Sequence, residues 1–191
     1  LPDSTLQAWL ATLDMDIKTI GWFTLVGAPY AFKFLWAPIL DRYALPVLGR
    51  RRGWMLLLQL LLAALIAVLG LQGERLGVGA PGEVVYAVAA IALFVAFVSA
   101  TQDIVIDAWR IEAAPQPMQG VMAAAYQLGY RIAVMVGSAG ALWIAADHGW
   151  TTAYTAMAVM VGVGILTTLV IAEPEPRVAR QEIDQEQRVI D

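Results

Sequence analysis

The apolar positions of this chain gather in five long runs. Residues 20–40, 54–71, 84–113, 120–146 and 152–172 are largely hydrophobic, and the segments around and between them carry most of the charges. Each run is close to the roughly 20 residues that a helix needs to cross the hydrocarbon core of a bilayer. The pattern therefore predicts an all-α, polytopic transmembrane helix bundle over residues 1–172. Residues 173–191, rich in Glu, Gln and Arg, are expected to form a solvated linker.

Prolines and small residues predict where these helices bend, end and touch. Pro29 and Pro38 predict kinks in the first run, and the prolines at 115 and 117 end the third. The sequence DHGW at 147–150 is expected to form a tight loop between the last two runs. Small residues of the fourth run are expected to let a neighbouring helix approach closely: Gly129, Gly137, Ser138, Ala139 and Gly140.

The first sixteen residues are amphipathic and allow two interpretations. Ser4 and Gln7 have the spacing of a capping box, which would start a helix at this point. The same segment could equally be the end of an earlier membrane span. The residues alone do not decide between the two.

Composition supports a membrane protein and excludes several kinds of site. The 191 residues are 60% hydrophobic and 15% charged, well outside the usual range of soluble globular chains. The absence of cysteine excludes disulfides, thiolate nucleophiles and sulfur-ligated zinc. His148, the only histidine, falls in the predicted loop, where an ordinary solvated side chain is expected. We therefore expect no metal and no cofactor. A membrane-embedded enzyme is disfavoured, and no long basic patch indicates a nucleic-acid partner.

The strongest candidate for a functional site is a polar stripe on the third run. At about 100° per residue, Ser99, Asp103, Asp107 and Arg110 fall within an arc of roughly 80° on one helix face. They follow an uncharged stretch, 84–98. Ionisable side chains inside a membrane are costly and commonly mark a transport pathway. For Asp107 and Arg110, pairing at the level of the lipid headgroups is an equal alternative. Asp103, one turn deeper, favours a functional role.

Two other runs carry one cation each. Lys33 lies about two thirds of the way along the first run. It either extends to the nearer membrane surface or is a buried partner of Asp103 or of a substrate. Arg131 lies roughly eleven positions into the fourth run, too deep to reach the surface easily, which favours function. Gln127 and Ser138 share its helix face within about 40°.

Basic residues are divided unequally between the two ends of the runs. One end has two basic residues, Lys18 and Arg75. The opposite end has eight arginines: Arg42, Arg50, Arg51, Arg52, Arg110, Arg177, Arg180 and Arg188. Because cytoplasmic loops carry the excess of Lys and Arg, the arginine-rich end is predicted to be cytoplasmic. Residue 1 would then lie on the outer side of the membrane and residue 191 in the cytoplasm.

Four sequence strings resemble one known family. FKFLWAPILDRY at 32–43, GRRRGW at 49–54, TQDIVIDAW at 101–109 and LGYR at 128–131 resemble the AmpG-like muropeptide permeases of Gram-negative inner membranes, a branch of the major facilitator superfamily. The similarity runs in order from about residue 6 to residue 176. It implies that the five runs are helices two to six of a transporter with twelve or more helices. Residues 1–13 would be the remainder of helix one, and the second six-helix half would be missing.

The resemblance also implies a solute and a set of site residues. An N-acetylglucosaminyl-anhydromuramyl peptide would be imported from the periplasm with protons. The path of substrate and proton would then include Lys33, Asp103, Asp107, Arg110, Gln127 and Arg131. The loop signature implies a conformational gate at Asp41, Arg42, Gly49, Arg50 and Arg51, with an insert at 43–48 that lengthens the general superfamily spacing. The alternatives are a related facilitator for another solute, such as an acyl-coenzyme A, or a non-transporting membrane receptor subunit.

Overall fold

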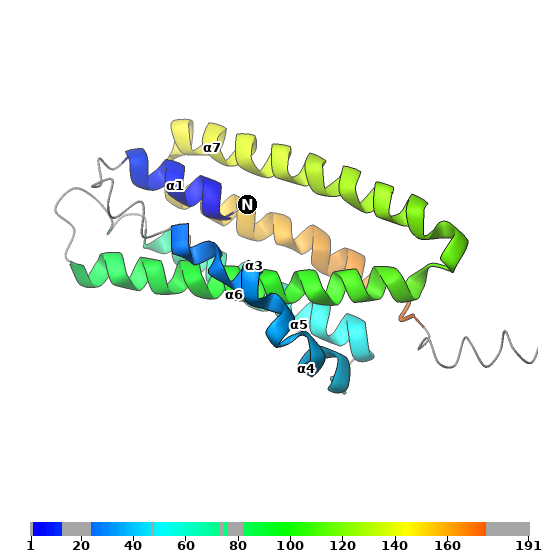
Figure 1. The fold of residues 1–191 in the computed structure, drawn as a ribbon. Helices are drawn as coiled ribbons and strands as arrows, with labels where there is room; N and C mark the ends of the chain where they lie inside the picture. The colour runs from blue at the N-terminus through cyan, green and yellow to red at the C-terminus, as the bar shows by residue number, and fades with distance from the viewer. Residues whose placement is uncertain (1, 13–23, 47, 73–74, 76–81, 175–191) are drawn as a thin grey trace, which may run out of the picture.

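Every regular element of the computed structural model is a helix within the residues that it describes, which are 2–12, 24–46, 48–72, 75 and 82–174. Three long helices dominate: α5 (Arg50–Leu71), α6 (Gly82–Ala113) and α7 (Gln119–Val170), with α5 packed against both of the others (Figure 1). By length and composition each of the three could cross a membrane. A helix satisfies its backbone polar groups internally, as a lipid environment requires. The prediction of an all-α bundle is confirmed.

α7 is a hairpin of two arms. Its backbone is helical except at Gly149, where φ is 82° and ψ is 165°, and Figure 1 shows the two arms running in opposite directions. Glycine adopts such a positive φ without the steric penalty of a Cβ. The predicted runs 120–146 and 152–172 are therefore the two arms. The structure has no separate loop at the predicted position, 147–150, because the chain changes direction at Gly149 alone.

The first predicted run, 20–40, is not one continuous helix. The structure describes it from Thr24 onward as four short pieces: η1 (Thr24–Gly27), α3 (Ala28–Phe32), η2 (Lys33–Leu35) and α4 (Ala37–Arg42). Pro29 and Pro38 stand in the first turn of α3 and α4, where the missing N–H breaks no helical hydrogen bond. The prediction of a single kinked span is therefore wrong in its continuity, because the prolines begin new helices.

The N-terminal helix α1 (Pro2–Thr12) starts before Ser4, so the capping-box interpretation is wrong. Trp9 of α1 is buried, with its ring centre 6.0 Å from that of Trp150 and 5.1 Å from that of Tyr154. These rings join α1 to the second arm of α7 near the hairpin reversal. Residues 13–23 and 175–191 lie outside the described residues, and with them Lys18 and the three arginines at 177, 180 and 188, which entered the prediction of sidedness.

Small residues bring α5 and the second arm of α7 together. A Cβ added at Gly70 would lie 2.7 Å from the Cβ of Tyr154. Further along, the buried hydroxyl of Thr168 donates to the side-chain oxygen of Gln59 at 3.0 Å. In the fourth run, a Cβ at Gly129 or Gly140 would meet nothing within 4 Å among the described residues. For these two glycines the expectation of close helix approach therefore stays a prediction.

Candidate functional site

An ion pair joins residues 24–42, called the interrupted segment because η1, α3, η2 and α4 divide it, to the polar stripe of α6. The Nζ of Lys33 donates to Asp103 Oδ2 at 3.3 Å, and the two side chains are 33% and 35% exposed. Of the alternatives for Lys33, the structure therefore has the one in which it meets Asp103. A partly buried pair is screened less than a surface pair, so its charge state responds more strongly to its neighbours.

Two hydrogen bonds on either side of Lys33 hold the same two elements together. The hydroxyl of Tyr30 donates to Ser99 Oγ at 2.7 Å, and Nε1 of Trp36 donates to Thr101 Oγ1 at 3.1 Å. The Trp36 ring also packs on Phe97, with 4.9 Å between ring centres. Sequence reasoning did not single out Tyr30 or Trp36. Their regular spacing, three residues before and after Lys33, is the signal that could have found them.

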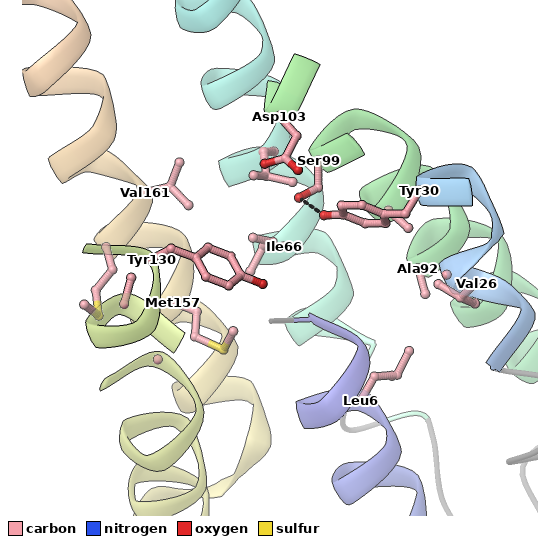
Figure 2. Close-up of a pocket in the computed structure, with 16 residues that line it drawn as sticks. Leu6, Val26, Tyr30, Ile66, Ala92, Ser99, Asp103, Tyr130, Met157 and Val161 are labelled. Atoms are coloured by element: carbon pink, nitrogen blue, oxygen red, sulfur yellow. Dashed lines mark hydrogen bonds between the residues drawn. The ribbon is translucent and has the colours of Figure 1, made fainter. Parts of the chain in front are cut away.

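A cavity of about 510 Å³ lies beside the ion pair, lined by η1, α3 and the long helices, with Leu6 of α1 at its border. Figure 2 shows Asp103 and the hydrogen-bonded pair of Tyr30 and Ser99 on one part of the wall, and Met157 on another. The wall is mostly apolar with a few polar groups, and the volume falls in the range of small-molecule sites. Tyr130, which sequence reasoning also missed, adds a second phenol ring.

The structure sets Gln127 and Arg131 apart from the lining of this cavity. Both side chains are exposed, and neither lines the cavity, whereas the adjacent Tyr130 does. Successive residues of a helix point about 100° apart, so Tyr130 and Arg131 face different directions. The predicted pathway residues are thus divided between the cavity and the neighbouring face of the first arm of α7.

Asp107 and Arg110 pair at i,i+3, which is one of the two alternatives that the sequence left open, and the distance is long. The NH2 group of Arg110 lies 3.4 Å from Asp107 Oδ1. The guanidinium carbon also stands 5.1 Å from the centre of the Tyr126 ring, in the geometry of a cation–π contact. Tyr126 belongs to the first arm of α7, so Arg110 links that arm to α6. Asp107 and Arg110 continue the polar stripe of α6 beyond Asp103, and Tyr126 of α7 packs against it.

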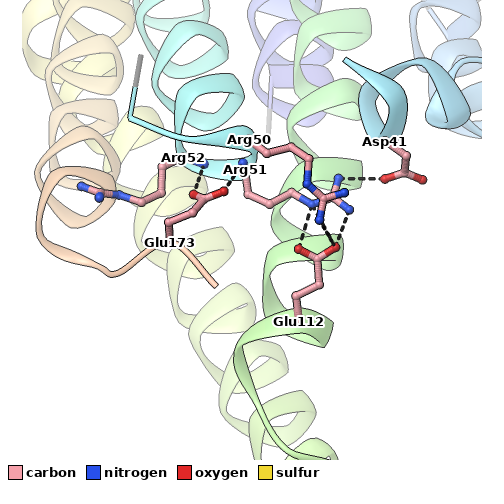
Figure 3. Close-up of polar contacts among 6 residues, drawn as sticks. All are labelled: Asp41, Arg50, Arg51, Arg52, Glu112 and Glu173. Carbon is pink, nitrogen blue, oxygen red and sulfur yellow. Dashed lines mark hydrogen bonds and ion pairs between the residues drawn. The ribbon is translucent and has the colours of Figure 1, made fainter. Parts of the chain in front are cut away.

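A network of charged side chains gathers where α5 begins (Figure 3). Arg51 is 4% exposed; its NH2 group lies 2.6 Å from Glu112 Oε1, and its NH1 group lies 2.8 Å from Asp41 Oδ1. Arg50 adds a contact to Glu112 at 2.9 Å. The network joins α4, α5 and α6 and includes three of the predicted gate residues, whereas Arg42 is exposed. Glu112 was missed as a site residue, although it ends the charged part of the third run.

Glu173 completes this end of the bundle by capping α5. Its carboxylate accepts hydrogen bonds from the backbone N–H groups of Arg51 and Arg52, at 2.7 and 3.0 Å. The first N–H groups of a helix need such acceptors. Gly49, at φ 92°, precedes the helix, and a Cβ there would lie 2.8 Å from Glu173 Cδ. The first residue of the predicted linker is therefore bound to the helix bundle, a contact that sequence reasoning did not predict.

Comparison with known proteins places these features in a family. A model of the Major Facilitator Superfamily matches residues 3–190. The chain is 45% identical over 175 residues to an anhydromuropeptide permease of Escherichia coli strain K12, which covers 91% of this chain and 34% of the permease. It is 40% identical over 180 residues to an uncharacterized protein of Haemophilus influenzae, covering 94% of this chain and 40% of that protein.

A more distant relative has the same extent of similarity. The chain is 33% identical over 181 residues to a putative transporter AmpG 3 of Rickettsia typhi, covering 92% of this chain and 41% of that protein. The chain thus spans about a third to two fifths of the length of these curated relatives.

Proposed function

Because this chain belongs to the Major Facilitator Superfamily, we propose that it forms helices two to six of a permease that imports anhydromuropeptides with protons across the bacterial inner membrane, for cell-wall recycling. The observation that carries the proposal is the Lys33–Asp103 ion pair beside a cavity of about 510 Å³. The 45% identity to an anhydromuropeptide permease supports the choice of solute. The other partners are the lipid bilayer and the second six-helix half of the same transporter.

Asp103 is the proposed carrier of the proton. The carboxylate of Asp103 attracts the ammonium of Lys33, 3.3 Å away, and protonation of Asp103 would remove that attraction. The two protonation states then favour different positions of the interrupted segment, and a proton biases the rocking equilibrium by that difference. Discontinuous helices next to a polar site are common at the binding sites of secondary transporters.

The solute is proposed to contact two adjacent surfaces. Among the described residues that line the cavity, Asp103 alone carries a charge, so the wall suits hydroxyl and amide groups better than carboxylates. Arg131 and Gln127 on the outward face of α7 are proposed to meet a carboxylate of the peptide, since a guanidinium binds carboxylates through two parallel hydrogen bonds. The rest of the transporter would complete this wall.

The arginine-rich end is proposed to be the cytoplasmic gate. Asp41, Arg50 and Arg51 share the network with Glu112, and Arg42 and Gly49 belong to the same loop. Asp107 and Arg110 lie between Asp103 and this end along α6, and are proposed as the route by which the proton leaves. Residue 1 would lie on the periplasmic side, and residues 173–191 would form a cytoplasmic linker.

Uptake of a labelled anhydromuropeptide tests this function. Cells that lack their own permease would express the full-length transporter that carries this sequence, with and without an uncoupler that collapses the proton gradient. We expect accumulation that the uncoupler abolishes. Accumulation that persists with the uncoupler would contradict proton coupling. Absence of uptake by a protein shown to be inserted would contradict the muropeptide assignment and favour another solute.

A further inference from the structure

The interrupted segment forms hydrogen bonds with two different faces of α6. Ser99 and Asp103 lie about 40° apart on the helix, whereas Thr101 lies about 160° from Asp103. Tyr30 and Lys33 reach the first flank, and Trp36 reaches the second. Ala100, which falls on the arc between the two flanks, is completely buried. These contacts on opposite faces therefore limit the rotation of the interrupted segment around the axis of α6.

The hydrogen bonds of Tyr30 and Trp36 to α6 help to determine where the ammonium of Lys33 lies. It opens the 3₁₀ turn η2, in a segment that prolines divide into short helices. A 3₁₀ turn has poorer hydrogen-bond geometry than an α-helix and often marks a hinge. The indole of Trp36, three residues later, is bound to Thr101 and packed on Phe97. Without the hydrogen bond from Trp36 to Thr101, the interrupted segment could rotate around α6, and this rotation would move Lys33 away from Asp103.

We propose that Trp36 is a positioning residue for proton coupling, whose hydrogen bond to Thr101 holds the ammonium of Lys33 on the carboxylate of Asp103. The inference rests on the proposed function, since the position of Lys33 matters for transport only if Asp103 carries the proton. It assigns a role to a side chain that does not itself line the cavity and whose hydrogen bond goes to Thr101.

The other groups around Asp103 leave Lys33 as the cation that most affects it. Tyr30 of α3 and Tyr126 and Tyr130 of α7 also face this region. On α6 itself, Arg110 contacts Asp107 and Tyr126, and Asp107 adds a negative charge. The position of Lys33 therefore has the largest effect on the charges that surround Asp103.

The test is the pH profile of initial uptake by the full-length transporter with Trp36→Phe. Phenylalanine keeps a ring to pack on Phe97 but removes the N–H group. We expect the pH of half-maximal uptake to rise, and to rise at least as far in Lys33→Met, because both variants take the ammonium away from Asp103. Thr101→Val, which removes the acceptor together with the hydrogen bond that the Thr101 hydroxyl donates to Phe97 O, should give the same shift as Trp36→Phe. Combining the two should add nothing.

Trp109→Phe is the matched control, because Trp109 on α6 donates a hydrogen bond of the same 3.1 Å length to Ala172 O, away from Asp103. It should leave the pH profile unchanged. If Trp36→Phe and Thr101→Val lower the uptake rate without moving the profile while wild-type uptake is proton-driven, the inference is overturned and the proposed function stands. A wild-type protein that transports without a proton gradient would overturn both.

Discussion

Arg51 illustrates how much one buried charge demands of its neighbours. Its side chain is 4% exposed, and carboxylates from α4 and α6 meet its N–H groups. Removing a guanidinium from water costs several kcal/mol, which is recovered only when well-placed oxygens of opposite charge accept its hydrogen bonds. Glu112, with a side chain 10% exposed, depends on the arginines in the same way. The loop signature at 41–51 is thus a packed network.

We expect Arg51→Met to lower the stability of the full-length transporter by about 3 kcal/mol, because it removes the hydrogen bonds that Arg51 donates to the buried carboxylate of Glu112. Asp41→Asn should cost less than about 1 kcal/mol, since Asp41 is 56% exposed. The measurement is the apparent unfolding temperature in detergent. Arg42→Met, at an exposed arginine of the same loop, is the control. Equal unfolding temperatures for Arg51→Met and Arg42→Met would contradict this account.

The contact between α5 and the second arm of α7 depends on the absence of a side chain. At Gly70 the two backbones approach so closely that an added Cβ would lie 2.7 Å from the Cβ of Tyr154. Tyr154 is itself buried and packs against Trp9. Neither helix can therefore move aside without disturbing α1 as well. Helix packing in membranes relies on small residues at such points.

Gly70→Ala should accordingly destabilise the bundle by about 1–3 kcal/mol, as overpacking of a core does. Gly162→Ala, where a Cβ would meet nothing within 4 Å, should be neutral or stabilising, because alanine favours a helix. The fraction of SDS needed to unfold each variant of the full-length transporter would compare them. A Gly70→Ala protein as resistant as Gly162→Ala would refute the close contact.

Sequence reasoning succeeded where one physical requirement acts along the chain and failed where distant residues meet. The need for about 20 apolar residues per span located α5, α6 and both arms of α7. The same criterion could not say whether Pro29 and Pro38 bend a helix or begin a new one. Tyr30 and Ser99 are 69 residues apart, and Arg51 and Glu173 are 122 apart. No local pattern encodes such pairings.

Taken together, the helices leave much apolar surface uncovered by the described residues. Only 17% of the most apolar stretch of α7 is buried, against 39% for α6. Lipid or the remainder of a longer transporter would cover this surface, and the relatives extend well beyond the segment that this chain matches. In the proposed function, the cavity and the face that carries Arg131 are parts of a larger path. The central claim for the part of the transporter that this chain forms is that Asp103 carries the proton.

The most direct test of that claim is Asp103→Asn in the full-length transporter, reconstituted in proteoliposomes. Asparagine keeps the shape of a protonated aspartate but cannot release a proton. We predict that exchange of labelled for unlabelled anhydromuropeptide stays within about threefold of wild type, whereas accumulation driven by an imposed proton gradient is lost. Asp147→Asn, at an exposed carboxylate near the hairpin reversal, should retain both activities. Gradient-driven accumulation by Asp103→Asn at the wild-type rate would contradict the account.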